Sequence, residues 1–213
     1  MKIALIGATG FVGTALLDEL LNRGHEVHAL QRDASKLAPR PGLSVKTVDV
    51  LGAPDLAAEL AGVDAVISAY NAGWTNPQLH DDFLRGSQRI TDAARAAGVR
   101  LIVVGGAGSL FIAPGQQLVD SPAFPAEWKA GALAAREVLN RLRADTTSLD
   151  WTFVSPAIHL EPGERTGRYR LGTESPVVDA AGDSRISVSD LAAAIVAEVE
   201  APAYRRNRFT AAY

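Results

Sequence analysis

The chain has 213 residues, of which 47% are hydrophobic and 21% are charged, an ordinary composition for a globular protein that buries its own core. Its formal net charge of −3 gives no electrostatic reason to expect nucleic-acid binding. The absence of cysteine excludes disulfides, thiolate nucleophiles and thiolate metal ligands and agrees with a reducing cytoplasm, and no apolar run approaches the roughly 18 residues that span a bilayer.

Along residues 1–156, apolar runs that indicate buried strands alternate with stretches of helical periodicity. We expect strands at 2–7, 26–30, 43–50, 64–70, 100–106 and 150–156. We expect helices at 11–23, 53–62, 78–97 and 126–143. Because the strands are apolar almost end to end, the pattern predicts a parallel sheet covered by helices on both faces, which is the doubly wound, Rossmann-like α/β fold.

The composition changes after Pro156, where glycine, proline and charged residues become frequent. We expect short strands or hairpins over 161–185, a helix over 187–200 and a last edge strand over 205–213. Ser187, with Asp190 three residues later, fits a capping box at the start of that helix. The tail is too short for an independent domain. We therefore interpret 1–213 as one domain, with a core over 1–156 and a cap over 157–213 that covers the carboxyl edge of the sheet on the substrate side.

Three glycines follow the first expected strand in "GATGFVG", namely Gly7, Gly10 and Gly13. In a strand–turn–helix unit, one glycine permits the tight turn, one lets a pyrophosphate approach the backbone, and one lets helix and strand pack closely. The free N–H groups of the following helix then meet the phosphates. The motif predicts dinucleotide binding; the alternative is a turn used only for packing.

With its G-x-x-G-x-x-G spacing, the chain resembles the short-chain dehydrogenase/reductase superfamily. It is most similar to the atypical members described as NAD(P)H-binding, flavin- or biliverdin-reductase-like and NmrA-like. The stretches that carry the resemblance are "GATGFVG", "VDV", "GGAGSL" and "DWTFVSPA...EPGERTG". The resemblance covers nearly the whole chain and implies the Rossmann-like fold and a nicotinamide cofactor.

The end of the second strand, "HALQRD", indicates which dinucleotide binds. An acidic residue there would bind the ribose 2′-hydroxyl of NAD, whereas this chain has neutral Gln31 followed by Arg32. A guanidinium suits a phosphate by charge and by fork geometry, so we expect NADP(H) rather than NAD(H). The alternative is that Arg32 is a solvated loop charge and that Asp33 takes part instead, although Asp33 and Ser35 equally suit a helix cap.

The ends of the later strands should complete the cofactor site. The resemblance implies that Asp49 contacts the adenine amino group with help from the backbone of the next residue; the alternative is a turn or cap residue. The small residues at 105–107 are consistent with a flat ligand against the backbone. The expected cofactor contacts are Gly7, Ala8, Thr9, Gly10, Phe11, Val12, Gly13, Arg32, Asp49, Val50, Ser68, Ala69, Tyr70, Gly105, Gly106, Ala107, Lys129, Ser155, Pro156 and Ala157.

The catalytic set that the resemblance implies is a serine, a lysine, and a tyrosine four residues before the lysine. Ser109 and Lys129 match, but Pro125 stands where the tyrosine is expected. This departure argues against standard alcohol–ketone oxidoreduction, epimerisation and dehydration, which need a general acid or base at the reacting carbon. His159 is a further candidate proton donor, or a loop residue near the surface. No metal-ligand spacing occurs, so we expect no metal site.

Two other features bear on the acceptor. Trp74 either stacks on a flat acceptor or packs under its own loop. The arginines of "EPGERTGRYRLG" would attract an anionic acceptor if this segment lay over the site; otherwise they belong to a solvated hairpin of mixed charge. These arginines are Arg165, Arg168 and Arg170.

The sequence thus favours an NADPH-dependent reductase that passes hydride to a flat, conjugated acceptor such as FMN, FAD, a quinone or a biliverdin-like pigment. The nicotinamide supplies the hydride, and such an acceptor can take its proton from solvent. One alternative is an NADP(H)-sensing regulatory protein without turnover, and a weaker one is an epimerase or dehydratase with a displaced acid. We expect a cytoplasmic monomer or homodimer whose partner is a small molecule rather than nucleic acid or a membrane.

Overall fold

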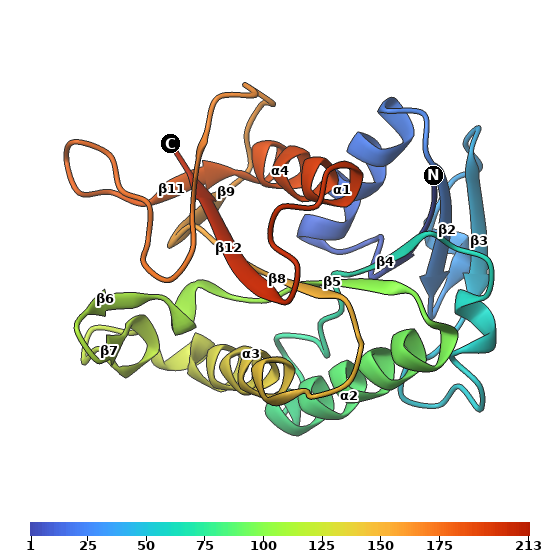
Figure 1. Ribbon diagram of the computed structural model, residues 1–213, viewed down its shortest axis with the longest axis horizontal. Coiled ribbons are helices and arrows are strands. Elements are labelled where there is room, and N and C mark those ends of the chain that lie inside the picture. Colours follow the sequence, from blue (N-terminus) through green and yellow to red (C-terminus); the bar gives the residue numbers. More distant parts are fainter.

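The computed structural model describes residues 1–213, and its centre is an eight-stranded sheet with the order β10-β12-β8-β5-β4-β1-β2-β3 (Figure 1). Every neighbouring pair is parallel except β10 with β12. The strands are β1 (Lys2–Ile6), β2 (Glu26–Gln31), β3 (Leu43–Thr47), β4 (Ala65–Ser68), β5 (Arg100–Val104), β8 (Trp151–Pro156), β10 (Arg170–Gly172) and β12 (Asn207–Ala212).

Helices cover both faces of this sheet. Helices α1 (Phe11–Asn22) and α4 (Val188–Glu200) lie together on one face, and α2 (Leu79–Ala97) and α3 (Ala126–Ala144) lie together on the other (Figure 1). Apolar clusters of 24 and 23 buried residues fill the two layers. The doubly wound, Rossmann-like fold predicted from the strand pattern is therefore confirmed. None of the helices combines the length and apolarity required to cross a membrane.

Two smaller sheets lie outside the central one. Strand β9 (His159–Glu161) pairs in parallel with β11 (Arg185–Ser187), and β6 (Phe111–Ala113) forms a hairpin with β7 (Gln116–Gln117). The helix expected over 53–62 is wrong: only the short 3-10 turn Ala58–Leu60 forms between β3 and β4. Ten residues are too few for a stable helix without strong tertiary packing, and Asp55 instead accepts the Ala58 N–H in a local turn at 3.0 Å.

The C-terminal residues join the core instead of only capping its carboxyl edge. Strand β12 lies between β8 and β10, so the prediction of a last edge strand is wrong. Its residues 208–212 are all buried, because a strand inside the sheet is covered on both faces. Helix α4 packs beside α1. That the whole chain is one domain stays our proposal, supported by this shared sheet.

Hydrogen bonds and an ion pair hold the segment over 161–169 to α1 and to the start of α4. A position over the site is one of the two alternatives that the sequence leaves for this segment. Arg165 Nε donates to both carboxylate oxygens of Glu19 in α1, at 3.0 and 2.9 Å. Ser187 Oγ donates to the Glu164 carbonyl at 2.9 Å. In the following strand, Arg170 donates to the backbone carbonyls of Val178 and Tyr213. Two of the three arginines considered for an acceptor therefore bind this chain's own groups.

Asp190 is the main anchor of this segment. Its carboxylate accepts hydrogen bonds from Thr166 Oγ1 (2.6 Å), the Gly167 N–H (2.7 Å) and the Tyr213 hydroxyl (2.9 Å). Ser187 Oγ caps the Asp190 N–H at 3.0 Å, so half of the predicted capping box forms while the Asp190 side chain binds elsewhere. Burial raises the pKa of Asp190, but these hydrogen bonds outweigh burial and hold that pKa below its ordinary value.

We expect Asp190→Ala to lower the free energy of unfolding by about 2–4 kcal/mol, because three donors lose a charged acceptor. Thermal unfolding at neutral pH measures this loss. A carboxyl with a depressed folded-state pKa stabilises the protein above its unfolded-state pKa and loses that effect as pH falls. The difference between wild type and variant should therefore shrink below pH of about 3.8, the ordinary aspartate value. A difference that grows in acid would contradict the assigned hydrogen bonds.

Candidate cofactor and active site

The glycine turn between β1 and α1 has the shape of a phosphate cradle. Gly7 has φ +86°, and a Cβ there would lie 2.4 Å from the Ala69 carbonyl oxygen. A Cβ on Gly13 would lie 1.9 Å from the Gly7 oxygen, so only glycine lets α1 approach this closely. Gly10 caps α1 without a side-chain hydrogen bond, and the first turn of α1 holds no acidic residue. An uncapped helix start beside a glycine turn fits the pyrophosphate of a dinucleotide.

Gln31 at the end of β2 holds this turn in place. The side chain is buried, and its amide oxygen, turned to the orientation that satisfies every polar atom in reach, accepts from the backbone N–H groups of Thr9 (2.9 Å) and Ala8. Its amide nitrogen then donates to Thr9 Oγ1 at 3.3 Å. The sequence marks Gln31 only as an uncharged residue, but its side chain directly supports the glycine turn.

The two residues after Gln31 behave differently from one another. The Asp33 carboxylate accepts from the Ser35 N–H at 3.1 Å and from Ser35 Oγ at 2.6 Å, which caps the short turn Ala34–Lys36. These hydrogen bonds lower the pKa of Asp33. Arg32 is exposed and makes no ion pair. The geometry leaves the guanidinium of Arg32 accessible to a ligand, while the carboxylate of Asp33 caps its own turn.

The residues after β3 are held by a contact that the sequence did not reveal. Arg89 of α2 donates from Nε to the Val50 carbonyl at 2.7 Å and from its Nη2 to the Ala53 carbonyl. The Asp49 carboxylate accepts the Leu51 N–H at 3.1 Å through one oxygen. Arg89 lies 39 residues from Val50, so no local pattern signals this support.

The order of strands brings the remaining predicted cofactor residues to one edge. Strands β8, β5, β4 and β1 are consecutive neighbours, so the segments that follow them, near Ser155–Ala157, Gly105–Ala107, Ser68–Tyr70 and the glycine turn, line the same carboxyl edge. The Ala69 N–H donates to the Ile6 carbonyl at 2.9 Å, which fastens the end of β4 to β1. A Cβ on Gly105 would lie 1.9 Å from Phe153 Cζ, so glycine is required there by packing.

The three predicted catalytic residues are placed very differently. Lys129 is exposed in the first turn of α3, and His159 is exposed at the start of β9. Ser109 is 1% exposed, and its Oγ and carbonyl oxygen both accept from the Arg208 guanidinium at 2.9 Å. Burial lowers the pKa of Arg208, and Glu174 partly offsets this. The Ser109 hydroxyl therefore binds a buried arginine, which favours a structural role over contact with substrate.

Two tyrosines, Tyr70 and Tyr169, are held by contacts within the chain and do not replace the tyrosine missing before Lys129. Tyr70 packs its ring on Gly86 of α2, where a Cβ would lie 2.4 Å from the ring, and donates its hydroxyl to the Asp82 carbonyl at 3.1 Å. Burial, followed by Asp82, raises the pKa of Tyr70 to about 12. Tyr169 packs against the α1 and α4 layer, and its pKa is raised by burial. Pro125 is the N-cap of α3.

We expect Tyr70→Phe to leave turnover within about twofold of wild type and to cost about 1 kcal/mol of stability through the lost hydrogen bond. Its pKa of about 12 keeps the hydroxyl neutral at physiological pH, so its removal should not shift the pH profile of the reaction. A pH–rate measurement on both proteins checks this. A loss of about 100-fold in kcat in the variant would identify Tyr70 as the acid.

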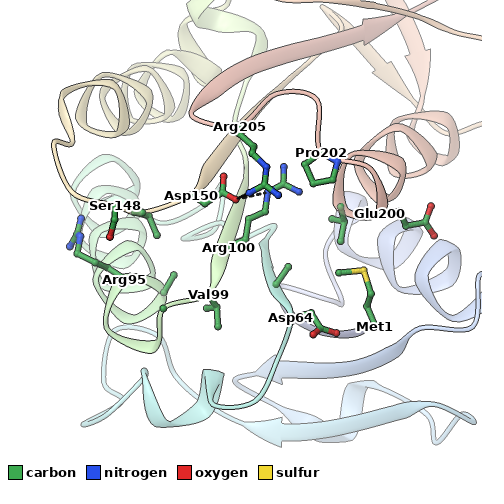
Figure 2. A pocket seen from close by; sticks show the side chains of 15 residues that line it. Met1, Asp64, Arg95, Val99, Arg100, Ser148, Asp150, Glu200, Pro202 and Arg205 are labelled. Atoms are coloured by element: carbon green, nitrogen blue, oxygen red, sulfur yellow. Dashed lines mark hydrogen bonds and ion pairs between the residues drawn. The ribbon is translucent and has the colours of Figure 1, made fainter.

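A cavity of about 510 Å³ lies at the opposite, amino edge of the sheet. Figure 2 shows Arg205 and Asp150 joined by an ion pair, with Arg100 beside them; Asp64, which also lines the cavity, directly precedes β4. Arg100 also pairs with Glu198 at 2.5 Å. Because dinucleotides bind at the carboxyl edge of a doubly wound sheet, this cavity is separate from the candidate site. No group of three or more potential metal ligands occurs in the structure.

Fold and glycine turn together define a dinucleotide-binding Rossmann protein, and comparison with known proteins identifies the dinucleotide as NAD(P)H. Residues 7–202 match the family described as NAD(P)H-binding, and the chain belongs to this family. It is 41% identical over 214 residues to the uncharacterized protein YwnB of Bacillus subtilis (strain 168), covering 99% of this chain and 97% of the relative.

Two solved structures extend the comparison. A candidate epimerase from Bacteroides thetaiotaomicron is 46% identical, with a TM-score of 0.91, over 100% of this chain and 96% of the other. A candidate NADH-flavin reductase from Streptococcus pneumoniae is 35% identical, with a TM-score of 0.89, over 100% and 99% of the two chains. The class resembled in the sequence, an atypical short-chain dehydrogenase/reductase with reductase-like and epimerase-like neighbours, is confirmed.

Proposed function

We propose that this protein is an NADPH-dependent reductase that passes hydride to a flat, conjugated acceptor such as a flavin, a quinone or a biliverdin-like pigment. The observation that carries the proposal is the pairing of a complete glycine cradle with the absence of a proton donor beside Lys129. Pro125 occupies the usual place of the acid, and the Tyr70 hydroxyl is bound to α2. The nicotinamide supplies the hydride, and a conjugated acceptor needs little acid catalysis. The likeness to a candidate NADH-flavin reductase supports the same class.

Within this proposal, the chain's own residues bind and orient. The glycine turn and the start of α1 hold the pyrophosphate, Arg32 binds the 2′-phosphate, and Asp49 with Val50 meets the adenine. Lys129 holds the nicotinamide ribose, so Lys129→Ala should weaken NADPH and NADH alike. His159 stays a candidate proton donor for the acceptor. Ser109 has an indirect role: its hydrogen bonds with Arg208 fix the position of the loop after β5.

Steady-state oxidation of NADPH tests the proposal. Purified protein is mixed with NADPH and, in separate reactions, FMN, FAD, a quinone and biliverdin, and the reduced nicotinamide band is followed. We expect oxidation well above the protein-free rate with at least one acceptor, and a slower reaction with NADH. Tight NADPH binding without turnover for every acceptor would overturn the reductase in favour of an NADP(H)-sensing regulatory protein, which the missing proton donor also fits. Turnover of a nucleotide sugar would favour the epimerase class, which is the description of the relative from Bacteroides thetaiotaomicron.

We propose that the protein acts in the cytoplasm. A cysteine-free chain that uses the reduced cofactor pool suits the cytoplasm. A small-molecule acceptor is the expected partner, and the protein is expected to act as a monomer or homodimer.

A further inference from the structure

Two of the three tryptophans are exposed on the same side of α3. Trp74 is 62% exposed in the loop after β4, and Trp128 is 55% exposed in the first turn of α3, whereas Trp151 is 2% exposed at the start of β8. An aromatic side chain contributes its large apolar area only when something covers it. Both exposed rings belong to segments that follow carboxyl ends of strands, the edge that holds the glycine turn.

The loop that carries Trp74 is held by a set of hydrogen bonds. Asn71 Oδ1 accepts the Gly73 N–H at 2.7 Å, and Gly73 has φ +101°, a conformation that favours glycine. Asn76 Nδ2 donates to the Ala72 carbonyl at 3.3 Å and to Asp82 Oδ2 of α2 at 2.9 Å. Trp74 is therefore exposed in a loop whose conformation is fixed by hydrogen bonds.

The outer edge of the Trp74 ring rests on α3. A Cβ placed on Gly131 would lie 3.0 Å from Trp74 Cζ3 and 3.3 Å from Cη2, so the ring lies directly over this glycine. Trp128 precedes Gly131 by three residues, a spacing that puts both on one side of the helix. Helix α3 thus presents Trp128 beside the point where Trp74 touches it, and more than half of each tryptophan stays exposed.

We propose that Trp74 and Trp128 form the stacking surface for the flat ring of the acceptor. The inference rests on the proposed function and narrows it to a ring that binds by stacking on tryptophan rather than through a proton donor. Aromatic rings stack with offset faces and add to the gain from burying apolar area. The surface lies within the first two turns of α3, beside Lys129, the proposed contact of the nicotinamide ribose, so an acceptor there would sit next to the nicotinamide end of the cofactor. Asn71 and Asn76 are positioning residues that keep Trp74 over α3.

Tryptophan fluorescence in the absence of NADPH tests this surface directly. Purified wild-type protein is titrated with FMN and with riboflavin, which carries the same ring without the phosphate. We expect both to quench most of the emission from the exposed tryptophans and to leave the emission of buried Trp151. We expect Trp74→Ala and Trp128→Ala each to weaken binding of both flavins about tenfold or more, with NADPH affinity unchanged. Leu171→Ala is the matched control, because Leu171 on β10 is also a large exposed apolar residue, and this variant should bind as wild type.

A variant of Asn76 tests the surface without removing either tryptophan. Asn76→Ala, which leaves both rings intact, should weaken flavin binding less than Trp74→Ala and thereby covers the case in which Trp74→Ala fails to fold. Flavin affinity equal to wild type in both tryptophan variants overturns the inference. If Trp74→Ala instead abolishes self-association of the protein and leaves flavin binding unchanged, the exposed tryptophan belongs to a contact between two copies of the chain, which also overturns the inference. Flavin binding that depends on the tryptophans, without NADPH oxidation, would support the stacking surface and overturn the proposed reductase activity. NADPH oxidation with an acceptor KM unchanged in both tryptophan variants would support the reductase activity and overturn the stacking surface.

Discussion

Replacing Arg32 with alanine should weaken NADPH binding about tenfold to 100-fold and change NADH binding by less than about threefold. A charge-assisted hydrogen bond is worth about 1.5–3 kcal/mol, and only NADPH carries the 2′-phosphate that would form one here. The structure leaves the exposed Arg32 unpaired, whereas the Asp33 carboxylate is engaged by Ser35. The side chain of the preceding residue, Gln31, is a neutral amide and adds no charge repulsion to the phosphate.

Equilibrium titration of both nucleotides measures this selectivity. Lys36→Ala is the matched control, because Lys36 is an exposed cation of the short turn Ala34–Lys36 that follows Arg32 and lies outside the proposed contact. Equal losses for NADPH and NADH in the Arg32 variant would show that this residue does not bind the 2′-phosphate. A larger NADPH loss in Lys36→Ala than in Arg32→Ala would move the assignment to Lys36.

Gly13→Ala should have the largest combined effect on stability and cofactor binding. Its Cβ would stand 1.9 Å from the Gly7 oxygen and 2.7 Å from the Gly7 carbonyl carbon, both backbone atoms of the turn itself. Because backbone cannot move aside as a flexible side chain does, α1 or the turn must shift. We expect a loss of about 1–3 kcal/mol or more in the free energy of unfolding, with both nucleotides binding at least about 100-fold more weakly.

Gly10→Ala separates packing from cofactor approach. A Cβ on Gly10 would lie 3.4 Å from the Gly7 oxygen, an ordinary contact, and Gly10 has φ −78°, which any residue adopts. The variant should therefore fold with nearly wild-type stability and still bind both nucleotides more weakly, because its methyl group would stand in the turn proposed to hold the pyrophosphate. Thermal unfolding and nucleotide titration on both variants check the pair. Wild-type nucleotide affinity in Gly10→Ala would place the pyrophosphate elsewhere.

The fold could be predicted because its signals are local. Continuous apolar runs specify buried parallel strands, and "GATGFVG" between the first strand and helix specifies the turn. The edge-strand prediction for 205–213 failed although the local signal existed: the residues from Phe209 to Ala212 are nearly all apolar, as in an interior strand. The helix expected over 53–62 failed because a ten-residue periodic stretch decides little without knowledge of its packing.

From the sequence, the candidate site could be predicted only where it consists of backbone segments, namely the glycine turn and the ends of the strands. The strand ends meet because of strand order, which the alternation of elements implies. Side-chain roles depend on distant partners: the Ser109 hydroxyl binds Arg208, which is 99 residues away. Arg89 holds Val50 across 39 residues. The support that Gln31 gives to Ala8 and Thr9 likewise follows from the pairing of β1 with β2 and has no signature in either segment alone.

The central claim, hydride transfer from NADPH to a flat acceptor, is tested most directly by anaerobic single-turnover kinetics. Protein loaded with NADPH, or with NADPH carrying deuterium at the transferring C4 position, is mixed with each acceptor, and the acceptor's own absorbance is followed. The account predicts reduction of at least one acceptor far faster than in protein-free buffer, with a slower reaction from the deuterated cofactor. Rates equal to the buffer background for every acceptor would contradict it.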